Sequence, residues 1–279
     1  MSYKTILVHV DASRRASERI RIAAQIALAE NAHLIGTAMT GLSRFVFEGS
    51  GFDLNVAPWS VHLNGMRERA NSALEAFERQ ARAMGVPSLE SRLVDDEAAA
   101  GISVQARYCD LLVIGQTDVG ETTPGMRPDF PEYVVINSAR PVLIVPAAGH
   151  FEYVGQRVLV AWNASLEATR AVAGAIPLLR RAQQVDVAVF RSSAEAGAHG
   201  AQPGADIALY LARHDIQVEV LQEDTETDVG HALLLAASDW SYDLIVMGGY
   251  GHSRLHEILL GGATRTMLEA MTVPVLMSH

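Results

Sequence analysis

The sequence contains one cysteine, Cys109, among 279 residues. A single thiol excludes an internal disulfide framework and is typical of a protein kept in a reducing compartment. Cys109 comes just before an apolar run, Leu111 to Ile114, that indicates a buried strand. Because free cysteine is usually buried, we expect a small buried side chain here rather than a reactive thiol.

Positive charge and long apolar runs are also scarce. Lys and Arg number 22 against 32 Asp and Glu, which gives a net charge of −10 without any basic block. Nucleic acids and anionic membranes both attract clustered positive charge, so we expect neither as a partner. No apolar run approaches the ~20 residues of a membrane span, and residues 1–11 fit a core strand better than a signal peptide. The sequence therefore predicts a soluble, cytoplasmic protein.

Three segments of the first half recur, in the same order, in the second half. The matched pairs are 6–13 with 158–165, 108–115 with 241–248, and 140–145 with 273–277. Three matches in one order indicate a tandem duplication of a domain-sized unit. We therefore expect a first domain over 1–148 and a second over 149–279.

Each unit alternates apolar strand patterns with helical patterns, which favours βαβ crossovers and a parallel sheet. The expected strands are 6–10, 34–39, 88–94, 111–114 and 142–145, then 158–162, 185–190, 218–222, 244–247 and 275–277. The expected helices are 16–29, 61–84, 98–108 and 132–136, then 166–182, 205–214, 229–240 and 262–271. Pro177 should kink or interrupt the helix that contains it.

A glycine-rich turn follows the strand 244–247. Gly248, Gly249 and Gly251 let the backbone approach a ligand closely. Nine residues separate Gly251 from Gly261, which with Gly262 opens the next helix. Free N–H groups and the helix dipole at such a turn favour anions, so the pattern indicates a phosphate site. It is neither a Walker loop nor a Gly-x-Gly-x-x-Gly fingerprint.

The spacing Gly-x2-Gly-x9-Gly followed by a small residue, here Gly248, Gly251, Gly261 and Gly262, resembles the nucleotide-binding signature of the universal stress protein family. That family often has Ser or Thr where this chain has Gly262. The resemblance implies an α/β fold of two tandem Rossmann-like units. Each unit would be a five-stranded parallel sheet, of order 3-2-1-4-5, with helices on both faces. It also implies ATP or another adenine nucleotide as ligand, with or without Mg, in a stress-response protein.

The candidate binding residues lie at the carboxyl ends of the second unit's strands and along the glycine motif. They are Trp162, Asn163, Phe190, Met247, Gly248, Gly251, His252, Ser253, Gly261, Gly262, Ala263 and Thr264. Asn163 stands where the family typically has Asp, and it either contacts the ligand or caps the following turn. His252 and Ser253 could reach a phosphate, or Ser253 could cap the next turn. Thr264 could supply the hydroxyl that Gly262 lacks.

The first unit departs from this pattern. Asp118 stands where the second unit has Gly251, Glu121 adds another carboxylate, and the glycine spacing is lost. Carboxylates near phosphates repel them by about 1 kcal/mol or more per close pair. We therefore interpret the first unit as a degenerate copy, although it keeps a polar residue, Asp11, after its first strand. Its aromatic stretch 40–60 fits a surface loop, a lid, an interface or a second ligand site.

No catalytic constellation or metal-ligand set is present in the sequence. His256 and Glu257 lack ligand partners at suitable spacing. The sequence thus favours a nucleotide-binding regulatory protein with slow ATP hydrolysis at most. A ligand-free adaptor is the alternative, and an ATP-splitting enzyme is less favoured because its signature loops are missing.

The last strand of each unit is an expected sheet edge, which invites pairing. Members of the family commonly dimerise through this strand. We therefore expect the two halves to form a pseudo-dimer within one chain, with a homodimer as a further option. The particular stress, the protein partner and the number of phosphates stay open.

Overall fold

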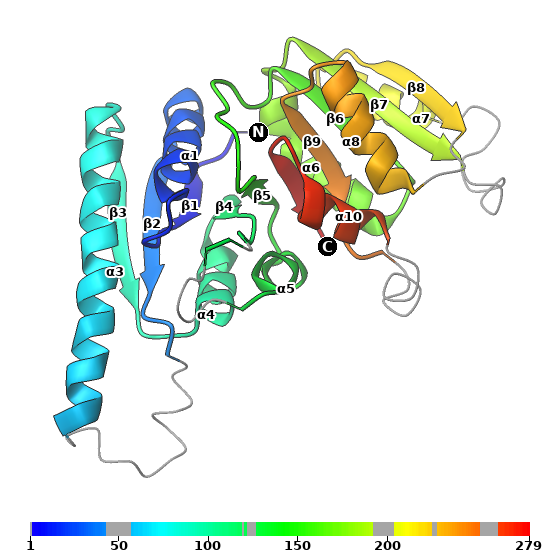
Figure 1. Ribbon diagram of the computed structural model, residues 1–279. Helices are drawn as coiled ribbons and strands as arrows, with labels where there is room; N and C mark the ends of the chain where they lie inside the picture. The colour runs from blue at the N-terminus through cyan, green and yellow to red at the C-terminus, as the bar shows by residue number, and fades with distance from the viewer. Residues whose placement is uncertain are drawn as a thin grey trace. The chain divides into compact units, whose positions relative to one another are not determined.

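The computed structural model (Figure 1) describes residues 2–42, 57–118, 120–121, 127–191, 204–224, 228–251 and 262–279. At 57–62, 190–191 and 223–224 it describes the backbone alone. The chain divides into two compact units, Ser2–Arg140 and Pro141–His279.

The unit Ser2–Arg140 contains four parallel strands in the order β3-β2-β1-β4. These are β1 (Thr5–His9), β2 (His33–Met39), β3 (Leu89–Val94) and β4 (Leu111–Gly115). Its helices are α1 (Ala16–Glu30), α3 (Ala57–Ala83), α4 (Ala98–Gln105) and α5 (Phe130–Asn137), with a short 3₁₀ turn at Ala106–Tyr108. The two central strands are apolar and buried, as expected for a parallel sheet covered on both faces.

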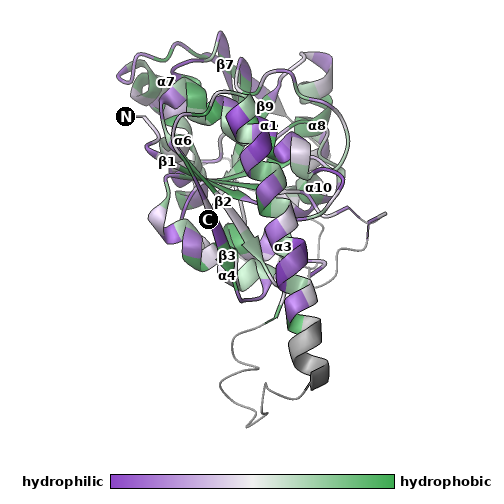
Figure 2. Cartoon of the chain, turned by 90° about the vertical axis from the view of Figure 1, so that its left-hand side faces the viewer, coloured by the Kyte–Doolittle hydropathy of each residue, from purple (hydrophilic) through white to green (hydrophobic). Residues whose placement is uncertain are grey.

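The helices of this unit pack in pairs, α1 beside α3 and α4 beside α5. The long helix α3 buries Phe77 against β2, where Gly36 leaves room for the ring. A Cβ at Gly36 would come within 2.4 Å of that ring. Figure 2 shows hydrophilic residues along the visible side of α3, which agrees with an amphipathic helix on a sheet.

The unit Pro141–His279 contains six strands in the order β5-β10-β9-β6-β7-β8. They are β5 (Val142–Val145), β6 (Arg157–Ala161), β7 (Gln184–Arg191), β8 (Glu219–Asp224), β9 (Leu244–Gly248) and β10 (Val275–Ser278). Its helices are α6 (Leu166–Leu179), α7 (Ala205–Ala212), α8 (Val229–Asp239) and α10 (Ala263–Ala270). The strands β6 to β10 follow the predicted order 3-2-1-4-5, and α8 packs beside α10.

The last strands of the two repeats pair with each other. Strand β5, the last strand of the first repeat, runs antiparallel to β10 and belongs to the second compact unit. Leu143 lies opposite Leu276 in this pairing. The two predicted edge strands therefore pair with each other, as the pseudo-dimer hypothesis expects. The boundary between the compact units falls between Arg140 and Pro141 of the sequence. The domain boundary after residue 148 stays a prediction from the repeat.

Two matched aspartates explain one of the sequence repeats. Asp110 accepts hydrogen bonds from the backbone N–H groups of Lys4 and Thr5, at 2.7 and 3.0 Å. Asp243 likewise accepts from Gly155 and Gln156, at 2.8 and 3.0 Å. In each copy the carboxylate thus fixes the start of the first strand beside the fourth. This repeated residue supports the fold and lies away from the glycine turn.

Two smaller expectations can be compared directly. Cys109 is 3% exposed, and burial raises the pKa of its thiol to about 12, which fits a small buried side chain rather than a reactive thiol. Pro177 lies inside α6, which runs on to Leu179 and then ends, short of the predicted residue 182. Within the described residues, no helix has the length and apolar character required to cross a bilayer.

Candidate functional site

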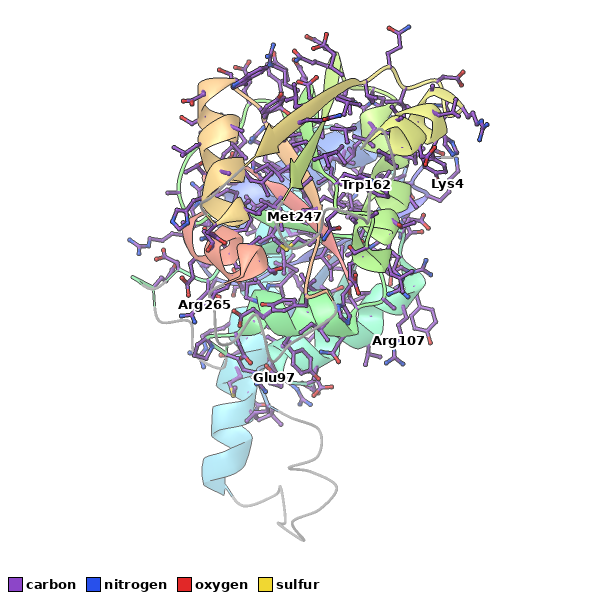
Figure 3. The ribbon with its side chains drawn as sticks, turned by 90° about the vertical axis from the view of Figure 1, so that its right-hand side faces the viewer. Lys4, Glu97, Arg107, Trp162, Met247 and Arg265 are labelled. Carbon is purple, nitrogen blue, oxygen red and sulfur yellow. The ribbon has the colours of Figure 1, made fainter. Side chains whose placement is uncertain are left out.

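The candidate site of the second unit begins at the carboxyl ends of β6 and β9. Trp162 follows β6 and donates its backbone N–H to Ala188 of the neighbouring strand, at 2.9 Å. Met247, near the end of β9, is 5% exposed. Figure 3 labels both residues. Both residues stand at the carboxyl ends of their strands, where ligands bind in doubly wound sheets.

Asn163 forms the turn between β6 and α6. Its side-chain oxygen accepts a hydrogen bond from the Ser165 backbone N–H at 3.2 Å, and Ala164 between them has φ of 58°. Ser165 in turn caps α6 by accepting from the Ala168 N–H at 3.1 Å. The turn-capping interpretation of Asn163 is therefore confirmed. Its side chain is also exposed to solvent, and ligand contact stays a prediction.

The glycine turn is held tightly at Gly248. A Cβ there would come within 2.6 Å of the Ala168 backbone nitrogen and 2.9 Å of the Glu167 carbonyl carbon. Only glycine lets β9 approach the first turn of α6 this closely. At Gly251, by contrast, the nearest atom of the described residues would be a Glu167 carboxylate oxygen at 3.5 Å, which is an ordinary contact. Gly248 is thus required for packing against α6, whereas the described residues leave room for a Cβ at Gly251.

Gly262 and Thr264 begin α10. Gly262 precedes the helix and offers no side-chain cap. Thr264 is 3% exposed, and its hydroxyl accepts the Tyr250 backbone N–H at 3.2 Å. Thr264 therefore ties the glycine turn to the helix, a role that the sequence did not indicate. Ala263 is the first residue of α10 and is half-buried.

Part of the predicted site lies outside the described residues. This applies to His252, Ser253 and Gly261, and to the side chain of Phe190, whose backbone belongs to β7. Most of the aromatic stretch 40–60 also falls outside. The interpretations of these residues therefore stay predictions.

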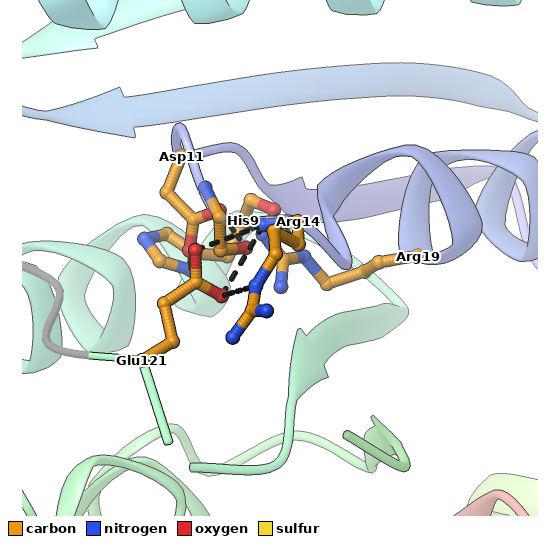
Figure 4. A network of polar contacts seen from close by, with 6 residues as sticks. His9, Asp11, Arg14, Arg19 and Glu121 are labelled. Atoms are coloured by element: carbon orange, nitrogen blue, oxygen red, sulfur yellow. Dashed lines mark hydrogen bonds and ion pairs between the residues drawn. The ribbon is translucent and has the colours of Figure 1, made fainter. Parts of the chain in front are cut away.

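The first unit fills the corresponding space with its own side chains (Figure 4). Arg19 is 3% exposed, and its guanidinium donates to Asp11 at 2.8 Å and to the His9 carbonyl at 2.7 Å. A Cβ at Gly115 would lie 2.6 Å from a terminal nitrogen of Arg19. The guanidinium therefore occupies the end of β4, where Gly248 stands in the second copy. Eight residues after Asn163, the matching position in α6 holds Ala171.

In the first unit a carboxylate also accepts a backbone N–H just before the start of α1. Both oxygens of Glu121 accept the Arg14 backbone N–H, at 3.1 and 3.2 Å, just before α1 begins. Asp118, three residues before Glu121, accepts the Gly120 N–H within its own loop at 2.8 Å. Backbone N–H groups at a helix start are the groups that bind anions. Here a side chain of the chain itself provides the anion.

A model described as the universal stress protein family matches residues 2–146 and again residues 155–279. The chain belongs to the universal stress protein family. A universal stress protein from Archaeoglobus fulgidus DSM 4304 has a similar structure, with a TM-score of 0.73 and 16% identity over 98% of this chain and 97% of that one. A functionally unknown protein from Pseudomonas aeruginosa PAO1 is also similar, with a TM-score of 0.61 and 16% identity over 98% of this chain and 92% of that one. These structures show the shared fold, and no curated protein matches the sequence.

The polar network of this universal stress protein changes two pKa values. Burial lowers the pKa of His9 to about 4, with Asp11 opposing and Arg19 adding to the effect. Burial alone would raise the pKa of Asp11, but Arg19, His9 and the hydrogen bonds from Ser13 outweigh it and hold that pKa well below its usual range. Asp11 is therefore a carboxylate and His9 is neutral near pH 7. The charge of Asp11 is already balanced by Arg19.

Sequence reasoning missed two residues of this tandem universal stress protein, Arg19 and Glu167. Both lie in the first turns of helices, where charged residues are commonplace and carry no signal of their own. Comparing the two copies gives a weak signal, since Arg19 aligns with Ala171 in the repeat and Glu167 aligns with Arg15. Glu167 is 7% exposed, and its Oε2 has no hydrogen-bond partner among the described residues. The described ranges contain no cluster of acidic, His or Cys side chains that could hold a metal by itself.

Proposed function

We propose that this universal stress protein is a regulatory protein that binds one adenine nucleotide in its second half, with ATP as the first candidate. The phosphates would lie at the glycine turn 248–251 and the start of α10, and Asn163 would face the nucleoside. Family membership and the family's glycine spacing support this proposal.

The observation that carries the proposal is the contrast between the copies. In the first, Arg19 covers Gly115 and Glu121 caps the Arg14 N–H, so the anion position is occupied from within. In the second, Ala171 replaces that arginine and the backbone of α6 covers Gly248 instead. At Gly251, where the first copy has Asp118, a Cβ would make only an ordinary contact with the described residues. A ligand with phosphates is therefore expected in one copy only.

A ligand-free adaptor is the second candidate, because Gly248 and Thr264 have structural roles that need no ligand. An enzyme is less favoured, since the sequence lacks the signature loops of ATP-splitting enzymes. The test is to extract the full-length protein purified without added nucleotide and to identify released nucleotides by chromatography. About one equivalent of adenine nucleotide supports binding. Protein that carries none, and takes up none when ATP, ADP or AMP is added, would support the adaptor.

A further inference from the structure

Glu167 places a carboxylate beneath the glycine turn of the second unit. Its backbone lies against Gly248, and its Oε2 lies 3.5 Å from where a Cβ of Gly251 would stand. The residue is 7% exposed, and among the described residues no group donates a hydrogen bond to that oxygen. A buried carboxylate oxygen without a partner is unfavourable. This oxygen is therefore available to a ligand.

The charge of Glu167 conflicts with a bare phosphate. An ionised carboxylate only accepts hydrogen bonds and repels other anions. At the matching position, four residues after Asp11, the first copy has Arg15. The copy expected to hold phosphates thus carries the negative side chain, and the closed copy carries the positive one.

A divalent cation resolves this conflict. Magnesium takes oxygen ligands, keeps several waters, and is commonly held by one or two carboxylates together with substrate phosphates. Glu167 offers one such oxygen at the turn. A single carboxylate does not hold magnesium by itself, so we expect the cation to arrive with the nucleotide phosphates.

We propose that Glu167 is a ligand of a divalent cation that joins the protein to the phosphates, so that the second half binds the magnesium complex of the nucleotide. This inference rests on the proposed function. It adds a metal-binding residue and makes the cation a condition of tight binding. It also predicts that Mg²⁺ alone does not bind at this turn.

The experiment is calorimetry with ATP, in Mg²⁺ or in EDTA, on the full chain and on Glu167→Gln. Wild type should bind at least about tenfold more weakly in EDTA. Glu167→Gln should bind with similar affinity in both conditions, within about threefold. Glu75→Gln removes an exposed carboxylate from α3 and is the matched control, which should behave as wild type. Circular dichroism checks that each variant is folded.

Charge neutralisation is separated from direct ligation by hexaamminecobalt(III), whose ammine ligands do not exchange. It should fail to replace Mg²⁺ in wild type. Full replacement, or a Glu167→Gln variant that keeps the wild-type dependence on Mg²⁺, would overturn the metal role of Glu167 while nucleotide binding stands. Absence of nucleotide binding by every form, with and without Mg²⁺, would overturn the proposed function and this inference together.

Discussion

Gly248 and Gly251 stand three residues apart in one turn, but an added methyl group would meet different surroundings at the two positions. At Gly248 it meets backbone atoms of α6 at 2.6 and 2.9 Å, and at Gly251 it meets a side-chain oxygen at 3.5 Å. Backbone atoms cannot move aside without shifting the helix. The two glycines of the motif therefore have separable roles, packing at one and access at the other.

We expect Gly248→Ala to destabilise the protein by about 1–3 kcal/mol, as overpacking typically does. Gly251→Ala should change the free energy of unfolding by less than about 1 kcal/mol, since the described residues leave room for a methyl group there. Urea unfolding of both variants beside wild type is the measurement. Equal losses of stability at the two positions would contradict the different roles assigned to these glycines.

His9 gives the first unit a pH dependence of its own. Burial lowers its pKa to about 4, against about 6.5 in an unfolded chain, so the unfolded state binds the proton first as pH falls. The neutral, buried histidine therefore contributes its full stability above pH 6.5, and this contribution is lost between pH 6.5 and 4. At about 1.4 kcal/mol per pKa unit, the loss is about 3 kcal/mol.

His9→Gln should remove this part of the acid sensitivity. We expect the free energy of unfolding to fall less between pH 7.5 and 4.5 in the variant than in wild type, whatever the offset between them at pH 7.5. Denaturant unfolding at several pH values measures both slopes. Parallel pH profiles would show that His9 titrates normally in the folded protein.

Strand β10 lies between β9 and β5, parallel to the first and antiparallel to the second. Pro274 gives its carbonyl to Ile245 of β9, so the next residue, Val275, presents its backbone polar groups to β5. Val275 opposite Ile144 is then a hydrogen-bonded pair, and Leu276 opposite Leu143 is a non-hydrogen-bonded pair. In non-hydrogen-bonded pairs the side chains lie closest together.

This pairing predicts a cross-link within one chain. Replacing Leu143 and Leu276 with cysteine should give a disulfide on mild oxidation, because opposed side chains in such a pair lie near disulfide distance. A non-reducing gel should show a monomer of increased mobility. The single variants are the control and should not cross-link within the chain. Cross-linking into covalent dimers instead would mean that these strands pair between chains.

The elements themselves were largely predictable from the sequence. Apolar runs bounded by turn residues marked the central strands, since a covered parallel sheet requires such runs. Strands β3 and β8 carry charged residues, and the alternation of strands and helices located them to within a few residues. The pairing of β5 with β10 was also predictable, because each is the last strand of a repeat and an exposed edge invites pairing. The division of the chain between Arg140 and Pro141 was not predicted, since the repeat places the join after residue 148.

The closure of the first copy was predictable only in part. Asp118 and Glu121 could be recognised as unfavourable for phosphate from their charge. That Glu121 reaches the Arg14 N–H, 107 residues away, depends on how the loop folds back. Likewise, an arginine in a first helical turn does not disclose that it covers Gly115. Such contacts come from tertiary packing rather than local pattern.

At the scale of the whole chain, a duplication has produced two copies with different surroundings at the same strand ends. In one copy Arg19 pairs with Asp11, and Glu121 accepts the Arg14 N–H where a bound anion would otherwise lie. The other keeps the glycine spacing of the universal stress protein family and has Ala171 in place of the covering arginine. The central claim is that one chain therefore takes one nucleotide.

The most direct test is calorimetric titration of ATP, with Mg²⁺ present, into the full chain and two variants. Wild type should bind one nucleotide per chain. Gly251→Asp adds a charge where the phosphates are expected, and a loss of about 3 kcal/mol would weaken binding more than about a hundredfold. Asp118→Gly, the reverse change in the first copy, should leave one site of unchanged affinity. Two equivalent sites in wild type, or unaltered binding by Gly251→Asp, would contradict the account.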